Sequence, residues 1–269
     1  MEPALAVALL WLVFGGLHVG LATRRVRAAL VARLGEVGFR ALFSVLATVF
    51  FTLLVRYYAG HRLEGSAGLA LGHVTALRWA LMAVIVFGVV LAMASLVTYP
   101  VSPMALFTAT VRPPRGLERI TRHPFFMGFA LAALAHVPLA TRLVGAVFQA
   151  GLAALAIVGA WHQDRKLAAL RGRPYDDYVA QTSAVPFGAI LAGRQRLVWR
   201  ELPYAALALC LAAAVWLRAV HGAIFDHGGA WVVGVVLGGA AAAGLASWRR
   251  ARRARSLRAS PRWVGTPAA

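Results

Sequence analysis

Seven apolar runs, each close to the length that crosses a bilayer, constrain this chain more than any other feature. A helix needs about 20 apolar residues to span the hydrocarbon core of a membrane. The short segment "ATRL" between the fourth and fifth runs predicts a tight antiparallel hairpin of those two helices. We therefore predict an all-α, polytopic integral membrane bundle of about seven transmembrane helices. The runs cover residues 3–22, 38–56, 76–98, 124–141, 143–163, 203–220 and 229–248.

The composition agrees with a chain whose main solvent is lipid. Of its 269 residues, 61% are hydrophobic and only 14% are charged, whereas soluble domains are considerably more polar. The single cysteine, Cys210, lies in an apolar run, so the chain has neither a disulfide framework nor a cysteine-rich metal site.

The distribution of positive charge predicts the orientation of the helices. No basic residue precedes the first apolar run and an arginine cluster follows it, so we expect a retained helix with its N-terminus outside. With this orientation 23 of the 28 lysines and arginines, and the C-terminus, lie in the cytoplasm. The net charge of +19 then reflects topology and contact with anionic membrane lipid, and we expect no nucleic-acid partner. We expect the protein in the inner (plasma) membrane of a bacterium, with the inner segment 164–200 forming an interfacial lid.

Two histidines, His18 and His136, lie inside apolar runs. Polar groups at membrane depth are costly and usually face the interior of the bundle, where they serve a function. A structural histidine bonded to a carbonyl oxygen is one interpretation. A zinc site would need three or four ligands, whereas haem needs only one or two imidazoles between apolar helices. Two isolated histidines therefore fit haem best.

The other histidines have less unusual surroundings. His123 begins the fourth run beside Arg122, where a contact with backbone or phosphate is the simplest interpretation. Four more are expected near the outer surface as solvated or interfacial residues: His61, His73, His221 and His227.

Several segments resemble the NnrU family, and within it the carotenoid isomerases. They predict an NnrU-like membrane domain over residues 1–221. Residues 222–269 would add a C-terminal transmembrane helix with a basic cytoplasmic tail. The matching segments are "GLHVGLATRR" (16–25), "GHRLEG" (60–65), "RITRHP" (119–124), "ALAH" (133–136), "GAWHQDRKL" (159–167), "TSAVPFGAILAGRQRL" (182–197) and "ELPYAAL" (201–207).

The resemblance implies a haem b protein that converts the 15-cis double bond of a hydrophobic polyene to trans without net redox change. The family's proposed axial ligands fall on His18 and His136, which would be both metal ligands and catalytic residues. His61 and His123 would lie around the cofactor. Ala133 stands where the isomerases carry a cysteine.

Two other functions compete with the isomerase. The family name implies an accessory role in nitrite or nitric oxide metabolism, which haem would serve equally well. The segments "RHPFFMG" and "DRKLAALRGRPYDDYVAQTSAVPF" also resemble membrane methyltransferases that use S-adenosylmethionine. In that case Asp164 and Arg165 would be the acidic–basic pair at the cofactor.

Joint ligation by His18 and His136 carries a geometric condition. His136 lies about 18 Å along its helix from Pro124, whereas His18 lies roughly 6–9 Å from the inner arginine cluster. A tilt, a break near Gly15 and Gly16, or a deeper first helix would be needed to bring the two together. The haem propionates are expected to face Arg119 and Arg122, or Arg142.

Overall fold

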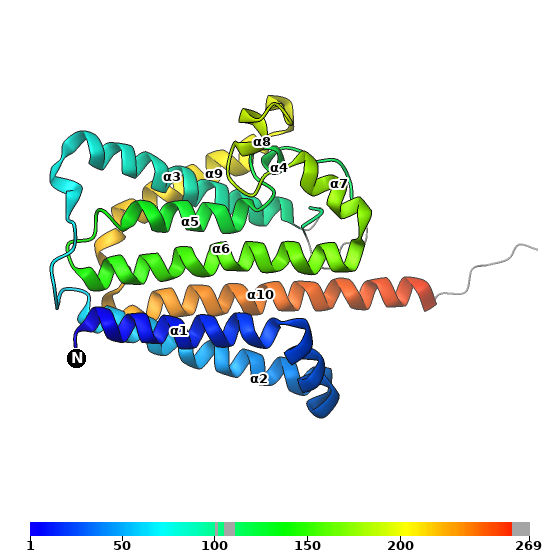
Figure 1. The fold of residues 1–269 in the computed structure, drawn as a ribbon, viewed down its shortest axis with the longest axis horizontal. Helices are drawn as coiled ribbons and strands as arrows, with labels where there is room; N and C mark the ends of the chain where they lie inside the picture. Colours follow the sequence, from blue (N-terminus) through cyan, green and yellow to red (C-terminus); the bar gives the residue numbers. More distant parts are fainter. Residues whose placement is uncertain (100–101, 105–110, 260–269) are drawn as a thin grey trace, which may run out of the picture.

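The computed structural model describes residues 1–99, 102–104 and 111–259, and within these ranges it forms helices and no strand. The long helices are α1 (Pro3–Ala22), α2 (Arg24–His61), α3 (Thr75–Thr98), α6 (Leu143–Arg171) and α10 (Asp226–Ala259), with the shorter apolar helices α5 (Pro124–His136) and α9 (Tyr204–Ala219). Most of these helices run side by side along the long axis of the molecule (Figure 1). The predicted all-α bundle is confirmed.

Each of the seven apolar runs falls on one of these helices. In the described ranges five helices are long and apolar enough to cross a membrane: α1, α2, α3, α6 and the part of α10 up to residue 246. Helix α5 has 13 residues and α9 has 16, so both are apolar but short. Pro138 explains the early end of α5, because proline lacks the N–H that a continuing helix needs. The count of seven spans therefore stays a prediction.

The helices pack in a defined order. Helix α9 packs on α3, α3 on α5, α5 on α6, α6 on α1, α1 on α2, and α2 on α10. The predicted hairpin of α5 and α6 is confirmed by this packing. Helices α3 and α5 approach most closely at Gly88 and Gly128, where a Cβ on either residue would lie 2.5 Å from the carbonyl oxygen of the other. Small residues at such a crossing allow two backbones to come into contact.

The first two helices differ from expectation at their glycines. Helix α1 is continuous through Gly15 and Gly16, so the break considered there does not occur. Helix α2 is instead interrupted at Gly35, whose φ of +71° is a conformation that glycine adopts without steric cost. Arg27 bridges this kink through an ion pair with Glu36 at 2.6 Å.

The two ends of the bundle carry different structures, which we name after the orientation predicted from charge. The outer end comprises the start of α1, the loop 62–74 with the short helix η1 (Leu71–His73), the turn 137–142 and the short helix η4 (His221–Ala223). The inner end comprises α4 (Leu117–Ile120), α7 (Arg173–Gln181), α8 (Gly188–Leu191) and η3 (Trp199–Glu201). These lie at opposite ends of the long axis in Figure 1. The last part of the predicted basic tail, from residue 260, is outside the described residues.

Candidate functional site

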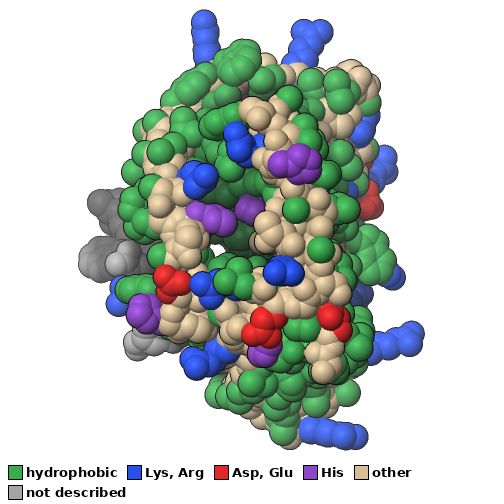
Figure 2. All heavy atoms as spheres, turned by 90° about the vertical axis from the view of Figure 1, so that its left-hand side faces the viewer, with side chains coloured by type: hydrophobic (Ala, Val, Ile, Leu, Met, Phe, Trp, Pro, Cys, Tyr) green, Lys and Arg blue, Asp and Glu red, His purple; other side chains and the backbone are tan. Residues whose placement is uncertain are grey.

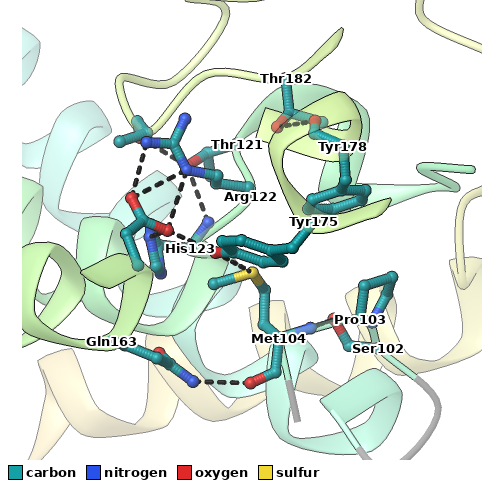
Figure 3. Close-up of polar contacts among 12 residues, drawn as sticks. Ser102, Pro103, Met104, Thr121, Arg122, His123, Gln163, Tyr175, Tyr178 and Thr182 are labelled. Carbon is teal, nitrogen blue, oxygen red and sulfur yellow. Dashed lines mark hydrogen bonds and ion pairs between the residues drawn. The ribbon is translucent and has the colours of Figure 1, made fainter. Parts of the chain in front are cut away.

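The carboxylate of Asp164 organises a polar cluster at the inner end. It accepts hydrogen bonds from the Arg122 guanidinium at 2.6 Å, from Nε2 of His123 at 2.8 Å and from the Tyr175 hydroxyl at 2.6 Å. Figure 3 shows these groups converging from the start of α5, from α6 and from α7. Met104 lies beneath them, with its sulfur 3.4 Å from the Tyr175 oxygen.

Backbone and side-chain bonds fasten the neighbouring loops to this cluster. The Thr121 hydroxyl donates to the Ala184 carbonyl at 2.6 Å, and the Arg122 amide donates to the Ser183 carbonyl at 2.9 Å. Arg119 donates to both carboxylate oxygens of Glu201, at 2.8 and 3.0 Å. Family-like segments that lie far apart in the sequence, 119–124, 159–167, 182–197 and 201–207, are thus brought together at the inner end.

The titratable groups outside the spanning helices have the charges that such a cluster requires. Burial, followed by the adjacent carboxylate of Asp164, raises the pKa of Tyr175, so its phenol stays a neutral donor. The hydrogen bonds from Arg119 and from the Gly116 amide lower the pKa of Glu201 to about 2. These groups satisfy one another, which is the behaviour of a structural network.

The methyltransferase hypothesis needed Asp164 to be available to a cofactor. Both oxygens of that carboxylate already accept hydrogen bonds from protein side chains. Arg119 and Arg122, two of the cations expected near haem propionates, are likewise engaged with Glu201 and Asp164. At the inner end, therefore, Asp164 is not available to a methyltransferase cofactor, and Arg119 and Arg122 are not available to haem propionates.

His123 belongs to the inner cluster. Its side chain is buried, with Nε2 bonded to Asp164 and Nδ1 without a partner among the described residues. Pro124 follows it as the first residue of α5. Thirteen residues separate it from His136 at the other end of the helix, a distance of about 20 Å along the axis. The structure therefore does not bring His123 to His136.

His18 faces a small apolar pocket between α1 and α2. The pocket is lined by Phe14, Leu17 and Leu21 of α1, and by Phe43, Leu46 and Ala47 of α2. Its Nδ1 is buried and has no partner within the described ranges. The ring contacts Phe14 and Phe43 at centroid distances of 5.4 and 5.0 Å. This imidazole is in an apolar environment, as the sequence predicted for a residue at membrane depth.

The level of His18 along the bundle can be derived from the contacts that α6 makes with α1 on one side and with α5 on the other. Gly15 of α1 faces Leu155 of α6, with 4.0 Å from a Cβ position to the leucine. Gly159, one turn further inward, faces the ring of Phe126 in α5. His18 lies three residues inward of Gly15, so it is at about the level of Phe126.

His136 lies much nearer the outer end. It follows Phe126 by ten residues, which is about 15 Å along α5. Helix α6 packs against both α1 and α5 and thereby separates them. The structure therefore does not bring His18 and His136 together, and α1 shows no break at Gly15 and Gly16 that would change this.

His136 is oriented by its own helix. Its Nδ1 is 2.7 Å from the Ala132 carbonyl oxygen and donates to it, which leaves Nε2 with a free lone pair. The ring of His221 lies parallel to it, with 6.0 Å between centroids and 7° between planes. Figure 2 looks onto this end and shows a hollow with histidine side chains around it and hydrophobic side chains deeper inside.

The end of α5 is held by a backbone network. The amide of Gly68 donates to the Thr141 carbonyl and that of Ala70 to the Ala140 carbonyl, both at 3.0 Å. These bonds fasten the loop 62–74 over the turn that follows His136. His61 is the last residue of α2, directly before this loop, and is stacked on Tyr57 at 4.2 Å, with Nδ1 bonded to the Tyr57 carbonyl at 2.9 Å. His61 and His136 thus both lie at the outer end, although no direct contact between them is seen among the described residues.

No local pattern around His221 marks it as part of a site. Its neighbours in the sequence are those of an interfacial histidine, which predict a solvated or interfacial residue. Its position depends on the chain crossing from α9, packed on α3, to α10, packed on α2. Desolvation lowers the pKa of His221, and the nearby charges of His136 and Arg218 lower it further.

Comparison with known proteins supports the family that is suggested by the segments meeting at the two ends of the bundle. The family model described as "NnrU protein" matches residues 6–228 of this chain. The chain belongs to the NnrU family. Two curated relatives are each named "15-cis-zeta-carotene isomerase, chloroplastic". The one from Arabidopsis thaliana is 32% identical over 77% of this chain, and the one from Zea mays is 28% identical over 75%. The matched regions cover 57% and 56% of those relatives. No solved structure matches the chain.

The cofactor expected from the NnrU family can be tested against this geometry. Within the described ranges no group of three or more histidine, cysteine, aspartate or glutamate side chains could hold a metal ion. A haem iron needs fewer ligands from the protein, because the porphyrin supplies four and the protein only one or two. His136 meets that need with a fixed tautomer and a free Nε2, at an end of the bundle that is hollowed in Figure 2. The pair of His18 and His136 does not.

Proposed function

We propose that this protein is a membrane isomerase that converts the 15-cis double bond of a carotenoid-like polyene to trans, using haem b bound at His136. Given that the chain belongs to the NnrU family, one structural observation supports this proposal. The Nδ1–H of His136 donates to the Ala132 carbonyl of its own helix at 2.7 Å, which leaves Nε2 with a free lone pair, and the outer end of the bundle, where His136 lies, is hollowed (Figure 2). Metal-bound histidines commonly donate their second N–H to a carbonyl in this way.

The residues of the chain have two roles in this proposal: some position His136, and others exclude water from its end of the bundle. The inner cluster around Asp164 fixes the start of α5 through His123 and Arg122, so it also sets the position of His136 at the other end. The outer loop 62–74, held by backbone bonds, covers that end of the helix. A bound ferrous haem would supply an iron that weakens the π-bond of a neighbouring double bond without net redox change.

The substrate would reach such a site from the lipid. An apolar polyene dissolves in the hydrocarbon core, and the apolar helices expose large hydrophobic side chains, including Phe129 of α5 and Trp161 of α6. The relatives named above act on a carotene according to their names, which supports a substrate of the same class here.

Activity in cells that accumulate a 15-cis carotene tests the isomerase. Expression of the chain should convert the cis isomer to the trans form, measured by chromatography of extracted pigments, and His136→Ala should abolish the conversion. His73→Ala is the matched control, because His73 is exposed and bonded to the Ala70 carbonyl at 3.0 Å. No conversion by the wild-type chain would remove the isomerase and leave the accessory role in nitrogen oxide metabolism as the next hypothesis.

Pigment in the purified protein tests the cofactor separately. Protein from haem-replete cells, purified in mild detergent, should show a Soret band and a pyridine haemochrome of b type. His136→Ala should lose most of it. A colourless wild-type protein, or an unchanged spectrum in the variant, would refute haem binding at His136.

A further inference from the structure

The first part of α2, before the kink at Gly35, is a short helix of its own over residues 24–34, and none of its side chains is buried. We propose that this helix lies in the inner interface of the membrane and binds the headgroups of anionic phospholipids there. The sequence predicts contact with anionic lipid for the chain as a whole, and the structure offers one element for it. The inference does not depend on the haem or on the isomerase.

The two ends of this helix are attached to membrane-spanning segments at a similar level. The rings of His18 in α1 and Phe43 in α2 lie 5.0 Å apart, so these two residues share a level. Helix α1 ends at Ala22, about 6 Å inward of His18, and the second part of α2 begins at Glu36, about 10 Å inward of Phe43. The helix 24–34 therefore joins two antiparallel spans at their inner ends, where Figure 1 shows the chain turning away from the long axis.

Apolar side chains form a stripe along this helix. Val26, Leu30 and Leu34 recur at every fourth residue and therefore lie on one face. Val26 is 41% exposed and Leu34 is 48% exposed, so the protein itself does not cover the stripe. A helix with an apolar stripe and basic residues around it lies in the plane of the interface, with the stripe turned toward the acyl chains.

Two arginines fix the angle of this helix. Glu36, just past the kink, pairs with Arg27 at 2.6 Å and with Arg40 at 2.9 Å. The Arg27 guanidinium also lies 5.3 Å from the centre of the buried Phe39 ring. These contacts tie the helix to the start of the next span. They also occupy Glu36, the one acidic residue in the sequence between residues 24 and 40.

Three further arginines of this helix are left for a ligand outside the protein. They are exposed and form no ion pair among the described residues: Arg24, Arg25 and Arg33. Their charge is complementary to the phosphate of anionic phospholipids, and each cation near such a surface contributes roughly a fivefold gain in binding. A soluble anion would meet the same charges but would leave the apolar stripe uncovered. The combination of stripe and cations therefore fits a lipid surface.

The position of the helix can be tested with an environment-sensitive dye on its two faces. Cys210 is the only cysteine, so a Cys210→Ala background allows one label at Val26→Cys, in the stripe, or at Ala28→Cys, on the opposite face. Both positions are exposed in the protein alone. In nanodiscs of phosphatidylcholine mixed with phosphatidylglycerol, the neutral quencher acrylamide should quench the label at Ala28→Cys severalfold more than the label at Val26→Cys. Equal quenching would show that the helix does not lie in the interface.

The lipid headgroup is tested with the label at Val26→Cys. Its quenching should increase severalfold when phosphatidylglycerol is omitted from the nanodiscs. Removal of the three unpaired cations should have the same effect in the mixed nanodiscs, in the variant Arg24→Gln/Arg25→Gln/Arg33→Gln. Soluble glycerol 3-phosphate should not change the quenching, and competition by it would show a site for free anions in place of lipid.

A matched variant removes the same charge from other exposed positions at the inner end. These positions also form no ion pair among the described residues, and the variant is Arg173→Gln/Arg196→Gln/Arg200→Gln. It should keep the full dependence on phosphatidylglycerol. An equal loss in both triple variants would show a general effect of net charge and would overturn the inference, as would a wild type that behaves identically with and without phosphatidylglycerol.

Discussion

Asp164 is the single residue on which most of the inner end depends. Its carboxylate faces two basic side chains, Arg122 and His123, and a phenol, Tyr175. The arginine and aspartate side chains are only 14% and 18% exposed, so water cannot replace a missing partner fully. Removing one member of such a buried pair costs more than the pair itself contributes, because the other charge is left without compensation.

Substitution of Asp164 by asparagine should therefore destabilise the protein by about 3 kcal/mol, within the range for a broken buried ion pair. Tyr175→Phe, which removes one hydrogen bond to the same carboxylate, should cost about 1–2 kcal/mol. Thermal unfolding in detergent measures both. Equal stability of Asp164→Asn and the wild type would contradict a structural role. Specific binding of S-adenosylmethionine to the wild type, lost in Asp164→Ala, would restore the methyltransferase hypothesis.

The ion pair of Glu201 and Arg119 should make the loops of the inner end sensitive to acid. The pKa of Glu201 is lowered from its ordinary value of 4.5 to about 2, so its contribution to stability is full above pH 4.5 and is lost as the pH falls toward 2. The difference in unfolding temperature between the wild type and Glu201→Gln should be constant near neutral pH and should shrink between pH 4.5 and 2. A difference that grows over this interval would contradict the assignment.

At the scale of the helices, the crossing of α3 and α5 decides how closely the bundle packs. Gly88 and Gly128 face one another there, and Ala92 and Ala132 lie beside them. A methyl group at either glycine would overlap backbone atoms, which cannot move away as a flexible side chain can. Because α5 carries His136, this crossing also positions the candidate site.

Gly128→Ala should consequently destabilise the protein by about 1–3 kcal/mol, the usual cost of overpacking. Gly16→Ala is a matched control, because a Cβ at Gly16 of α1 would meet no atom within 4 Å. The control should be neutral or slightly stabilising, since alanine forms helices better than glycine. Unfolding temperatures of the two variants in the same detergent test the contrast, and similar losses in both would argue against close contact of α3 and α5.

The helices themselves could be predicted from the sequence because a long apolar run has few alternatives in lipid. The limits of α5 and α2 could not be predicted as well. Helix α5 ends before Pro138, and α2 continues through a kink at Gly35 to Arg24. Each boundary depends on a single local residue whose effect is modest beside the hydrophobic pattern.

At the scale of the whole molecule, the candidate site depends on contacts between distant segments. The pattern predicted that His136 is functional, because its cost at membrane depth is visible in the sequence alone. The parallel arrangement of the His136 and His221 rings was not predictable, since the two residues lie 85 positions apart with the apolar helices α6 and α9 between them along the chain. The separation of His18 from His136 by α6 was equally hidden, because a sequence shows the depth of a residue but not which helix lies beside it.

The orientation of the whole bundle is the remaining prediction. With the N-terminus outside, 23 of the 28 lysines and arginines are cytoplasmic. The structure places the turn at Arg142 at the outer end, and α10 runs from η4 toward the opposite end (Figure 1). Alkaline phosphatase inserted at Arg142 should therefore be active in the periplasm of a bacterial host. The same enzyme fused after residue 259 should be inactive there, and a cytoplasmic reporter at that position should be active. An insertion after Gly193 in the inner loop is the control and should behave like the C-terminal fusion. Reporters at Arg142 and the C-terminus on one side of the membrane would show that an odd number of the three helices between them, such as the short α9, does not cross.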